Sequence, residues 1–266
     1  MEQTRPIEEE GKDTRMKIVV LGGTGLIGSR VVRLLQEMGH EIIAASGGTV
    51  DLLTGRGLSE ALQGAQVVVD VTNSPSFEDS AVLNFFTTSA RNLFPAEIAA
   101  GVRHHVALSI VGADRMPNLG YMRAKVAQEE AVKASGVPYT IVRGTQFFEF
   151  IGSLADGGTE NGTARVSNIL MQPIAADDLA SSVGKIALDS PTNGYINVAG
   201  PERRRLDELA RELFRARNDP RQVATDPSLG YFGGQVPENA LVPDGNALLG
   251  TERFSDWLAR SYPKPI

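Results

Sequence analysis

Residues 17–39 read KIVVLGGTGLIGSRVVRLLQEMG, a short β-branched run followed by glycines and then by apolar residues at helical spacing. This order predicts a strand, a tight turn and a helix. Gly22 permits the turn, Gly25 lets the backbone approach a phosphate, and Gly28 lets the helix pack closely. Because the free N–H groups of the helix start would face an anion, the segment predicts a dinucleotide-binding turn.

Apolar runs separated by segments of helix length continue along the chain. Further apolar runs occur at 41–45 (EIIAA), 66–70 (QVVVD), 104–109 (HHVALS), 139–143 (YTIVR) and 195–198 (YINV). Segments of helix length separate them, among them 26–38 and 78–101. Continuous runs, rather than strict alternation, indicate strands that are covered on both faces. We therefore predict an α/β fold with a doubly wound parallel sheet.

Three parts of the chain differ in character. Residues 1–15 contain eight charged and almost no apolar side chains, which predicts a disordered tail. We assign residues 16–145, together with 171–199, to a dinucleotide-binding Rossmann core. The glycine-rich residues 146–170 and the C-terminal residues 200–266 are assigned to a small cap that binds substrate.

The composition excludes several classes of function. No stretch of the chain approaches the ~20 apolar residues of a membrane span. The absence of cysteine excludes disulfides and thiolate sites, and three histidines leave little for a metal centre, so we expect no metal. A net charge of −6 argues against nucleic acid and anionic membranes as partners. We expect a cytoplasmic protein that binds a small molecule, with an oligomer remaining open.

The residues after the second predicted strand bear on the choice of cofactor. An NAD-binding site usually carries a carboxylate there, whereas this chain has Ser46, Gly47 and Thr49. We therefore expect NADP(H) rather than NAD(H). Asp51 is either an acceptor for the adenine amino group or a solvated acid. Leu52, next to Asp51, is a further expected contact. The glycine turn and the later strand end VTNSP (71–75), which could also be an ordinary turn, supply the others: Thr24, Leu26, Ile27, Val71, Thr72 and Asn73.

Tyr121 and Lys125 are four residues apart in a strongly helical stretch, so both side chains project from one helix face. A neighbouring ammonium favours the phenolate and would lower the pKa of the tyrosine. Ser109 ends the preceding strand and could hold a carbonyl oxygen while Tyr121 delivers a proton. The alternative is that Tyr121 packs against the sheet and Lys125 is a solvated surface residue.

Four segments together resemble the short-chain dehydrogenase/reductase superfamily, in particular its atypical NmrA-like NAD(P)-binding branch. They are GGTGLIG (22–28), the strand end at Ser109, YMRAK (121–125) and VPYTIVRGTQFFEF (137–150). The resemblance covers most of residues 16–200 and implies a Rossmann core of seven strands. It further implies Tyr121 as proton donor, Lys125 on the nicotinamide ribose and Ser109 orienting the substrate. It also places Gly144, Thr145 and Gln146 beside the nicotinamide, although this chain lacks the proline that usually follows Arg143.

Aromatic residues cluster after this last segment, and we expect Phe147, Phe148 and Tyr231 to line a substrate pocket. Core packing would explain the same residues. The sequence thus predicts an NADP(H)-linked reductase of a small carbonyl or quinone compound. Two alternatives remain open: a regulatory protein that senses NADP(H) without catalysis, and an epimerase or isomerase that retains NAD.

Overall fold

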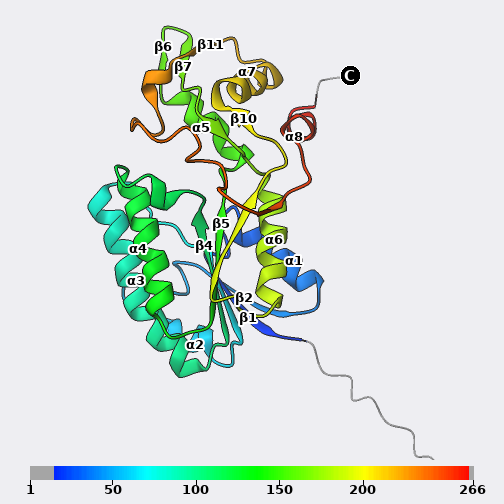
Figure 1. Ribbon diagram of the computed structural model, residues 1–266. Coiled ribbons are helices and arrows are strands. Elements are labelled where there is room, and N and C mark those ends of the chain that lie inside the picture. Colours follow the sequence, from blue (N-terminus) through cyan, green and yellow to red (C-terminus); the bar gives the residue numbers. More distant parts are fainter. Residues whose placement is uncertain (1–14, 264–266) are drawn as a thin grey trace, which may run out of the picture.

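The computed structural model describes residues 15–263, so all but the last residue of the predicted tail lies outside the described part (Figure 1). Its centre is a parallel sheet of seven strands in the order β12-β9-β5-β4-β3-β1-β2. The strands are β1 (Lys17–Leu21), β2 (Glu41–Ala45), β3 (Val67–Asp70), β4 (His104–Ile110), β5 (Tyr139–Gly144), β9 (Gly194–Ala199) and β12 (Ala247–Leu249). The predicted doubly wound fold is confirmed.

Helices cover both faces of the sheet. One face carries α1 (Gly28–Glu37) and α6 (Ala176–Leu188), and the other carries α2 (Leu58–Leu62), α3 (Asp79–Ala100) and α4 (Gly120–Ala134). In β1, Ile18 and Val20 pack toward α1 and α6, while Val19 and Leu21 pack toward α2 and α3. Because both faces are buried, the strand needs a continuous apolar run.

The remaining elements form a second unit above the carboxyl ends of the strands, which we call the cap (Figure 1). Its elements are α5 (Ile151–Asp156), β6 (Thr159–Glu160), β7 (Thr163–Val166), β8 (Leu170–Met171), β10 (Arg204–Arg205), α7 (Leu206–Arg217), β11 (Gln222–Thr225) and α8 (Phe254–Ser261), with short 3₁₀ helices at Ala113–Arg115, Phe148–Phe150 and Pro227–Leu229. The cap has its own apolar core, which includes Leu213, Phe254 and Trp257.

One strand within residues 200–266, β12, does not belong to the cap as assigned from the sequence. β12 pairs in parallel with β9, with Leu248 opposite Val198, and forms an edge of the main sheet. Leu248 and Leu249 are about half exposed, at 49% and 57%. A strand of three residues with such exposure lacks the long apolar run from which the other strands were predicted.

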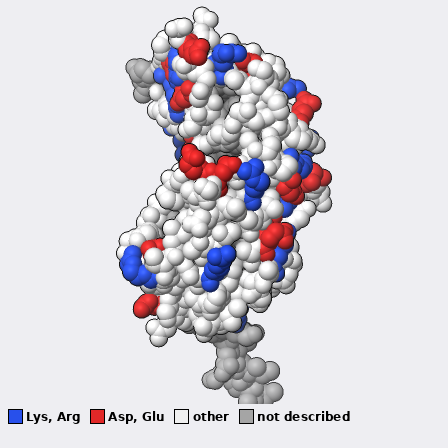
Figure 2. Space-filling model, turned by 90° about the vertical axis from the view of Figure 1, so that its left-hand side faces the viewer, with Lys and Arg blue, Asp and Glu red and all other residues white. Residues whose placement is uncertain are grey.

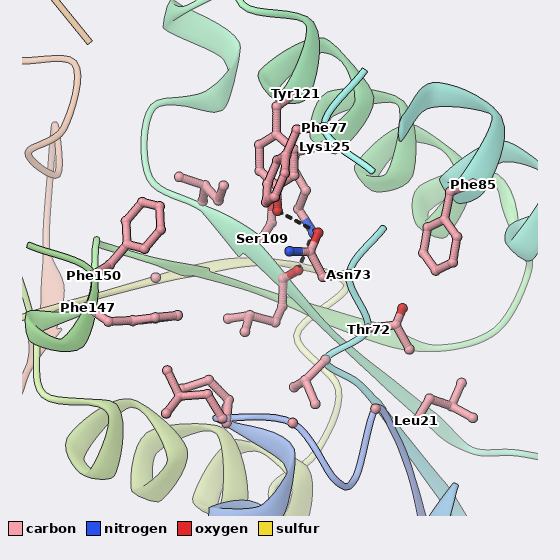
Figure 3. Close-up of a pocket in the computed structure, with 18 of the residues that line it drawn as sticks. Leu21, Thr72, Asn73, Phe77, Phe85, Ser109, Tyr121, Lys125, Phe147 and Phe150 are labelled. Carbon is pink, nitrogen blue, oxygen red and sulfur yellow. Dashed lines mark hydrogen bonds between the residues drawn. The ribbon is translucent and has the colours of Figure 1, made fainter. Parts of the chain in front are cut away.

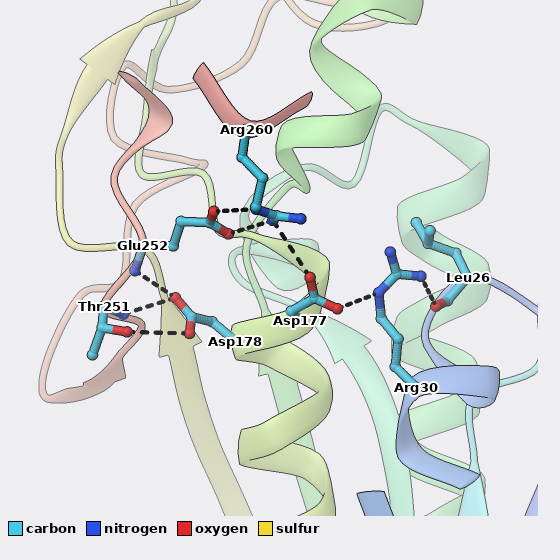
Figure 4. Close-up of polar contacts among 7 residues, drawn as sticks. All are labelled: Leu26, Arg30, Asp177, Asp178, Thr251, Glu252 and Arg260. Carbon is cyan, nitrogen blue, oxygen red and sulfur yellow. Dashed lines mark hydrogen bonds and ion pairs between the residues drawn. The ribbon is translucent and has the colours of Figure 1, made fainter. Parts of the chain in front are cut away.

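Two aspartates in the first turn of α6 tie the core to the C-terminal segment (Figure 4). Asp177 accepts a hydrogen bond from Arg30 Nε at 2.7 Å and lies 3.5 Å from Arg260 Nη2. Asp178 accepts hydrogen bonds from the backbone N–H groups of Thr251 and Glu252, at 2.7 and 2.8 Å. These contacts hold the chain leading into α8 beside the helix that follows the glycine turn.

Candidate active site

A cavity of about 1120 Å³ lies between the carboxyl edge of the sheet and the cap (Figure 3). Ligand pockets commonly measure ~300–1,000 Å³, so this one has room for a large ligand such as a dinucleotide. In open α/β sheets ligands bind at this edge, because the loops that follow the strands converge there. On the face shown in Figure 2, basic and acidic side chains are interspersed among uncharged ones and form no continuous basic patch. Among residues 15–263, no helix has the length and apolar character needed to cross a membrane.

The glycine turn has the backbone geometry that a pyrophosphate requires. Gly22 has a φ of +79°, in the left-handed region, and its N–H donates to Ala45 O at 2.9 Å. A Cβ on Gly28 would lie 2.1 Å from Gly22 O, which confirms that close packing excludes any side chain there. At Gly25 the only atom that a Cβ would approach within 4 Å is Gly22 O, at 3.3 Å. The turn therefore fits a phosphate group approaching Gly25.

The loop after β2 places Ser46 and Gly47 on the cavity wall, but not Thr49. The Thr49 hydroxyl closes the loop, because it accepts from Ser46 N–H and donates to Ser46 O, both at 3.1 Å. Arg56 Nη2 donates to Gly47 O at 3.3 Å, so a guanidinium lies against this loop. No sequence motif marks Arg56, since only the turn from Val50 to Gly57 returns it to the end of β2.

Asp51 lies on the cavity wall in the same loop. Its Oδ1 accepts a hydrogen bond from Leu53 N–H at 2.9 Å. Hydrogen bonds from Thr54 and Leu53 lower the pKa of the Asp51 carboxyl. Asp51 is therefore charged at neutral pH and can accept a hydrogen bond from a ligand amino group.

Tyr121 lies in the first turn of α4 and lines the cavity. Its hydroxyl donates to Asn73 Oδ1 at 2.9 Å (Figure 3). Burial raises the pKa of Tyr121 to about 12, against a small opposing effect of the Asn73 hydrogen bond. The expected lowering of this pKa by Lys125 is wrong for this structure, because desolvation of the phenolate dominates. The phenol is thus protonated at neutral pH and can act as a proton donor.

Lys125 is buried below Tyr121, with 3% of its surface exposed. Its ammonium donates to Leu108 O at 2.7 Å and to Gln128 Oε1, and it lies 4.6 Å from the centroid of the Phe86 ring. Burial lowers the pKa of Lys125 to about 8, although Asp70 and Glu129 partly oppose this shift. The alternative of a solvated surface lysine is therefore wrong.

Ser109 reaches the cavity wall, but its hydroxyl proton is engaged. Ser109 Oγ donates to Glu129 Oε1 at 2.6 Å. Both carboxylate oxygens of Glu129 also accept from Arg143, at 2.9 and 2.6 Å. Glu129 was not among the residues predicted from the sequence, although its spacing of four residues from Lys125 places it on the same face of α4.

Aromatic side chains line the outer part of the cavity. The Phe77 ring lies 5.7 Å from the Tyr121 ring and is 67% exposed. From the cap, the rings of Phe150 and Phe232 lie 6.0 Å apart, and Tyr231 contacts Phe232 at 4.6 Å. These rings give the site an apolar wall suited to a flat substrate.

Phe148 is not part of this wall, contrary to the sequence prediction. It is 2% exposed and packs in the cap core, with ring centroids 5.2 Å from Phe254 and 5.8 Å from Trp257. Phe150, two residues later, lies on the cavity side instead. Periodicity could not separate the two, because this segment is a short 3₁₀ helix rather than a strand or a long α-helix.

The cavity brings together most of the residues predicted from the sequence. They are Gly22, Thr24, Gly25, Leu26, Ile27, Ser46, Gly47, Asp51, Leu52, Val71, Thr72, Asn73, Ser109, Tyr121, Lys125, Gly144, Thr145, Gln146, Phe147 and Tyr231. Gly28, Thr49 and Phe148 do not line it.

Curated relatives match parts of this chain. A (4-alkanoyl-5-oxo-2,5-dihydrofuran-3-yl)methyl phosphate reductase of Streptomyces griseus is 31% identical over 162 residues, which are 56% of this chain and 54% of the relative. The photosystem II assembly factor Ycf39 of Cyanophora paradoxa is 27% identical over 156 residues, 53% of this chain and 49% of the relative. The divinyl chlorophyllide a 8-vinyl-reductase of Cucumis sativus is 28% identical over 229 residues, which cover 71% of this chain and 54% of the relative. The chain spans about half the length of these relatives.

Solved structures share the fold. The NADPH-dependent quinone oxidoreductase QOR2 of Escherichia coli, complexed with NADPH, gives a TM-score of 0.67 at 19% identity, covering 92% of this chain and 99% of that one. A short-chain dehydrogenase/reductase superfamily protein of Agrobacterium tumefaciens with bound NAD gives a TM-score of 0.68 at 17% identity, covering 92% of this chain and 96% of that one. At these identities the likeness concerns the fold alone.

The match to a family model agrees with the fold. Residues 48–185 match the NAD(P)H-binding family, and this segment is more than half of the chain. The resemblance inferred from the sequence is thereby confirmed, and an NmrA-like branch is consistent with it. The chain belongs to the NAD(P)H-binding family.

Proposed function

We propose that this protein is an NADP(H)-dependent oxidoreductase that reduces a small carbonyl or quinone compound. The observation that carries the proposal is the position of Tyr121. Its phenol, protonated because burial raises its pKa to about 12, shares one cavity with the glycine turn. A proton donor beside a dinucleotide site is what carbonyl reduction requires. The names of two relatives, a phosphate-ester reductase and a vinyl-reductase, support a reductase.

When bound, a reduced nicotinamide would supply the hydride, with its electron pair, that a carbonyl carbon needs for reduction. As the C=O π electrons move onto the oxygen, the Tyr121 O–H bond breaks and the proton joins that oxygen. The product is an alcohol, or a hydroquinone after tautomerisation, and water returns a proton to the phenolate. We assign Lys125 to the nicotinamide ribose, where its ammonium is held from below by Leu108 O.

Arg56 supports the preference for NADP(H). Its guanidinium lies against Gly47, at the loop that would receive the adenosine 2′-substituent, and residues 46–49 at the end of β2 carry no carboxylate that would repel a phosphate. Hydrogen bonds between charged partners contribute ~1.5–3 kcal/mol. Arg56→Ala should therefore weaken NADPH binding about tenfold or more and leave NADH binding unchanged, as titration of cofactor fluorescence would show. Equal losses for both cofactors would contradict this role.

The test of the proposed function is NADPH oxidation against a panel of quinones and aryl ketones. We expect turnover by the wild type and a loss of ~10²–10⁴-fold in kcat for Tyr121→Phe. The affinity for NADPH should change little, because the hydroxyl alone is removed. Tyr139→Phe is the matched control, since Tyr139 packs with α3 and α4 residues away from the cavity.

Two outcomes would overturn this assignment. An unchanged kcat in Tyr121→Phe would exclude the tyrosine as the acid. No turnover across the panel, with NADPH bound tightly, would favour the regulatory alternative, a protein that senses NADP(H) without chemistry.

A further inference from the structure

We propose that Asn73, rather than Ser109, donates the second hydrogen bond to the substrate oxygen, beside Tyr121. This inference rests on the proposed reductase function and refines its mechanism. It makes Asn73 a catalytic residue, although the strand-end position had suggested only a cofactor contact. Four observations carry it.

The first is the orientation of the Asn73 amide. Asn73 Oδ1 accepts a hydrogen bond from Ser74 N–H and another from the Tyr121 hydroxyl, both at 2.9 Å. An amide nitrogen could not accept from a backbone N–H, so the side chain cannot be flipped. Nδ2 therefore occupies the other position, and Figure 3 shows it turned toward the side of the cavity where Phe147 and Phe150 lie.

The second observation is that Nδ2 is available. Within residues 15–263, no protein group accepts a hydrogen bond from Asn73 Nδ2. The residue is exposed and lines the cavity, whereas the neighbouring Ser74 is buried. Two N–H donors consequently face the space in which a ligand would lie.

The third observation is the rigidity of the loop that carries Asn73. Asp70, at the end of β3, accepts hydrogen bonds from Thr72 N–H at 3.0 Å and from the Thr72 hydroxyl at 2.6 Å. Ser76 N–H donates to Ser74 Oγ at 3.2 Å. The donor is thus fixed before substrate binds, which is the condition under which a hydrogen bond stabilises developing negative charge efficiently.

The fourth observation concerns Ser109. A hydroxyl has one proton, and Ser109 gives it to Glu129, whose other contacts to Arg143 hold the carboxylate in place. A carboxylate is a stronger acceptor than a neutral carbonyl, so substrate binding would not release this proton. Only lone pairs of Ser109 remain for a ligand, and these repel an oxygen that gains negative charge. Ser109 is accordingly a positioning residue within the Glu129 network.

Tyr121 and Asn73 can reach the same oxygen. The two ends of an amide are about 2.2 Å apart. With Tyr121 Oη at 2.9 Å from Oδ1, the distance from Oη to Nδ2 is at most about 5 Å. A substrate oxygen can therefore lie within hydrogen-bond distance of both donors. When Tyr121 turns its proton to the substrate, Asn73 Oδ1 keeps the hydrogen bond from Ser74.

Turnover of 1,4-naphthoquinone with NADPH provides the first test. The chain has no cysteine that this quinone could alkylate. Asn73→Asp keeps an oxygen acceptor for Tyr121 and Ser74 but removes the donor, and Asn73→Ala removes both. We expect both variants to lose ~10²–10³-fold in kcat, as removal of one such donor does. Asn84→Ala, on the outer side of α3, is the matched control.

Ser109→Ala separates the two candidate donors. Its loss in kcat should be much smaller than that of Asn73→Ala, since its proton does not reach the substrate. If Ser109→Ala loses as much as Asn73→Ala, or if Asn73→Asp keeps the wild-type kcat, the inference is wrong while the reductase function stands.

A binding measurement provides a readout independent of turnover. In the complex with NADP⁺, calorimetry should give an affinity for 1,4-naphthoquinone about tenfold or more above that for naphthalene, which has no oxygen. This preference should vanish in Asn73→Ala and persist in Asn84→Ala. A preference that survives Asn73→Ala would exclude Asn73 as the donor. A preference lost with Asn73, in a wild type that never oxidises NADPH, would support the donor and overturn the reductase function.

Discussion

The sheet and the cap contribute to the same cavity in different ways. From the sheet, Gly22, Asn73 and Ser109 lie at or just after the ends of β1, β3 and β4, and parallel pairing fixes their relative positions. From the cap, Phe150 comes from a short 3₁₀ helix and Phe232 from a turn about eighty residues later in the chain. The groups assigned to chemistry therefore lie at the ends of paired strands, whereas the wall assigned to substrate depends on long-range packing.

The largest expected effect on cofactor binding is on the sheet side, at Gly28. In Gly28→Ala the new Cβ would meet Gly22 O at 2.1 Å, so the turn must open. We expect NADPH affinity to fall by about 100-fold or more, because the phosphate-binding N–H groups lose their arrangement. Cofactor fluorescence titration measures this. Gly245→Ala, where the Cβ meets nothing within 4 Å, is the control, and equal affinities in both variants would contradict the predicted site.

The next effect distinguishes two phenylalanines of the cap segment. Phe148→Ala empties a buried position and should lower the free energy of unfolding by ~3–5 kcal/mol. Phe150→Ala removes a ring from the cavity wall, so it should cost little stability and raise KM for the quinone. Urea unfolding and steady-state kinetics check the pair. Similar stability losses in both would show that Phe150 also belongs to the cap core.

A smaller effect is expected from pH, through Lys125. Because burial lowers its pKa to about 8, the ammonium is present below pH 8 and is lost as the pH rises above it. If the charge holds the cofactor, NADPH affinity should decline above pH 8, and Lys125→Met should show lower affinity without this inflection. The contribution of Lys125 to folding stability changes with pH in the opposite direction. Since the folded pKa is below the ordinary 10.5, the Lys125 contribution becomes more favourable between about pH 8 and 10.5. A wild-type affinity that is flat from pH 7 to 9.5 would contradict the role.

The smallest expected effect concerns the link between the two regions shown in Figure 4. Asp177, whose side chain is 42% exposed, contacts Arg30 and Arg260. Partly exposed ion pairs contribute ~0–1 kcal/mol, so Asp177→Asn should lower thermal stability only slightly, with the difference shrinking at high salt. A large loss of NADPH affinity in this variant would instead show that the link supports the glycine turn through Arg30.

Much of the sheet could be predicted because local patterns encode it. Six of the seven strands coincide with apolar runs, and the glycines mark the turn that follows the first. The edge strand β12 could not be found, since its leucines are half exposed and its pairing with β9 joins residues far apart in sequence.

The candidate site was predictable in part for the same reason. Tyr121 and Lys125 share a helix face, so their spacing revealed them together. The position of Arg56 against Gly47 and the inward packing of Phe148 depend on tertiary contacts that no spacing expresses. The pKa of Tyr121 also depends on burial, which is why the charge argument from Lys125 alone gave the wrong direction.

A crystal structure of the protein with NADPH would show whether Tyr121 and the glycine turn serve one bound dinucleotide. We expect the pyrophosphate to lie against the N–H groups between Gly22 and Gly28, and the nicotinamide to lie beside the Tyr121 hydroxyl and the Lys125 ammonium. A dinucleotide bound elsewhere, or a nicotinamide remote from Tyr121, would contradict it.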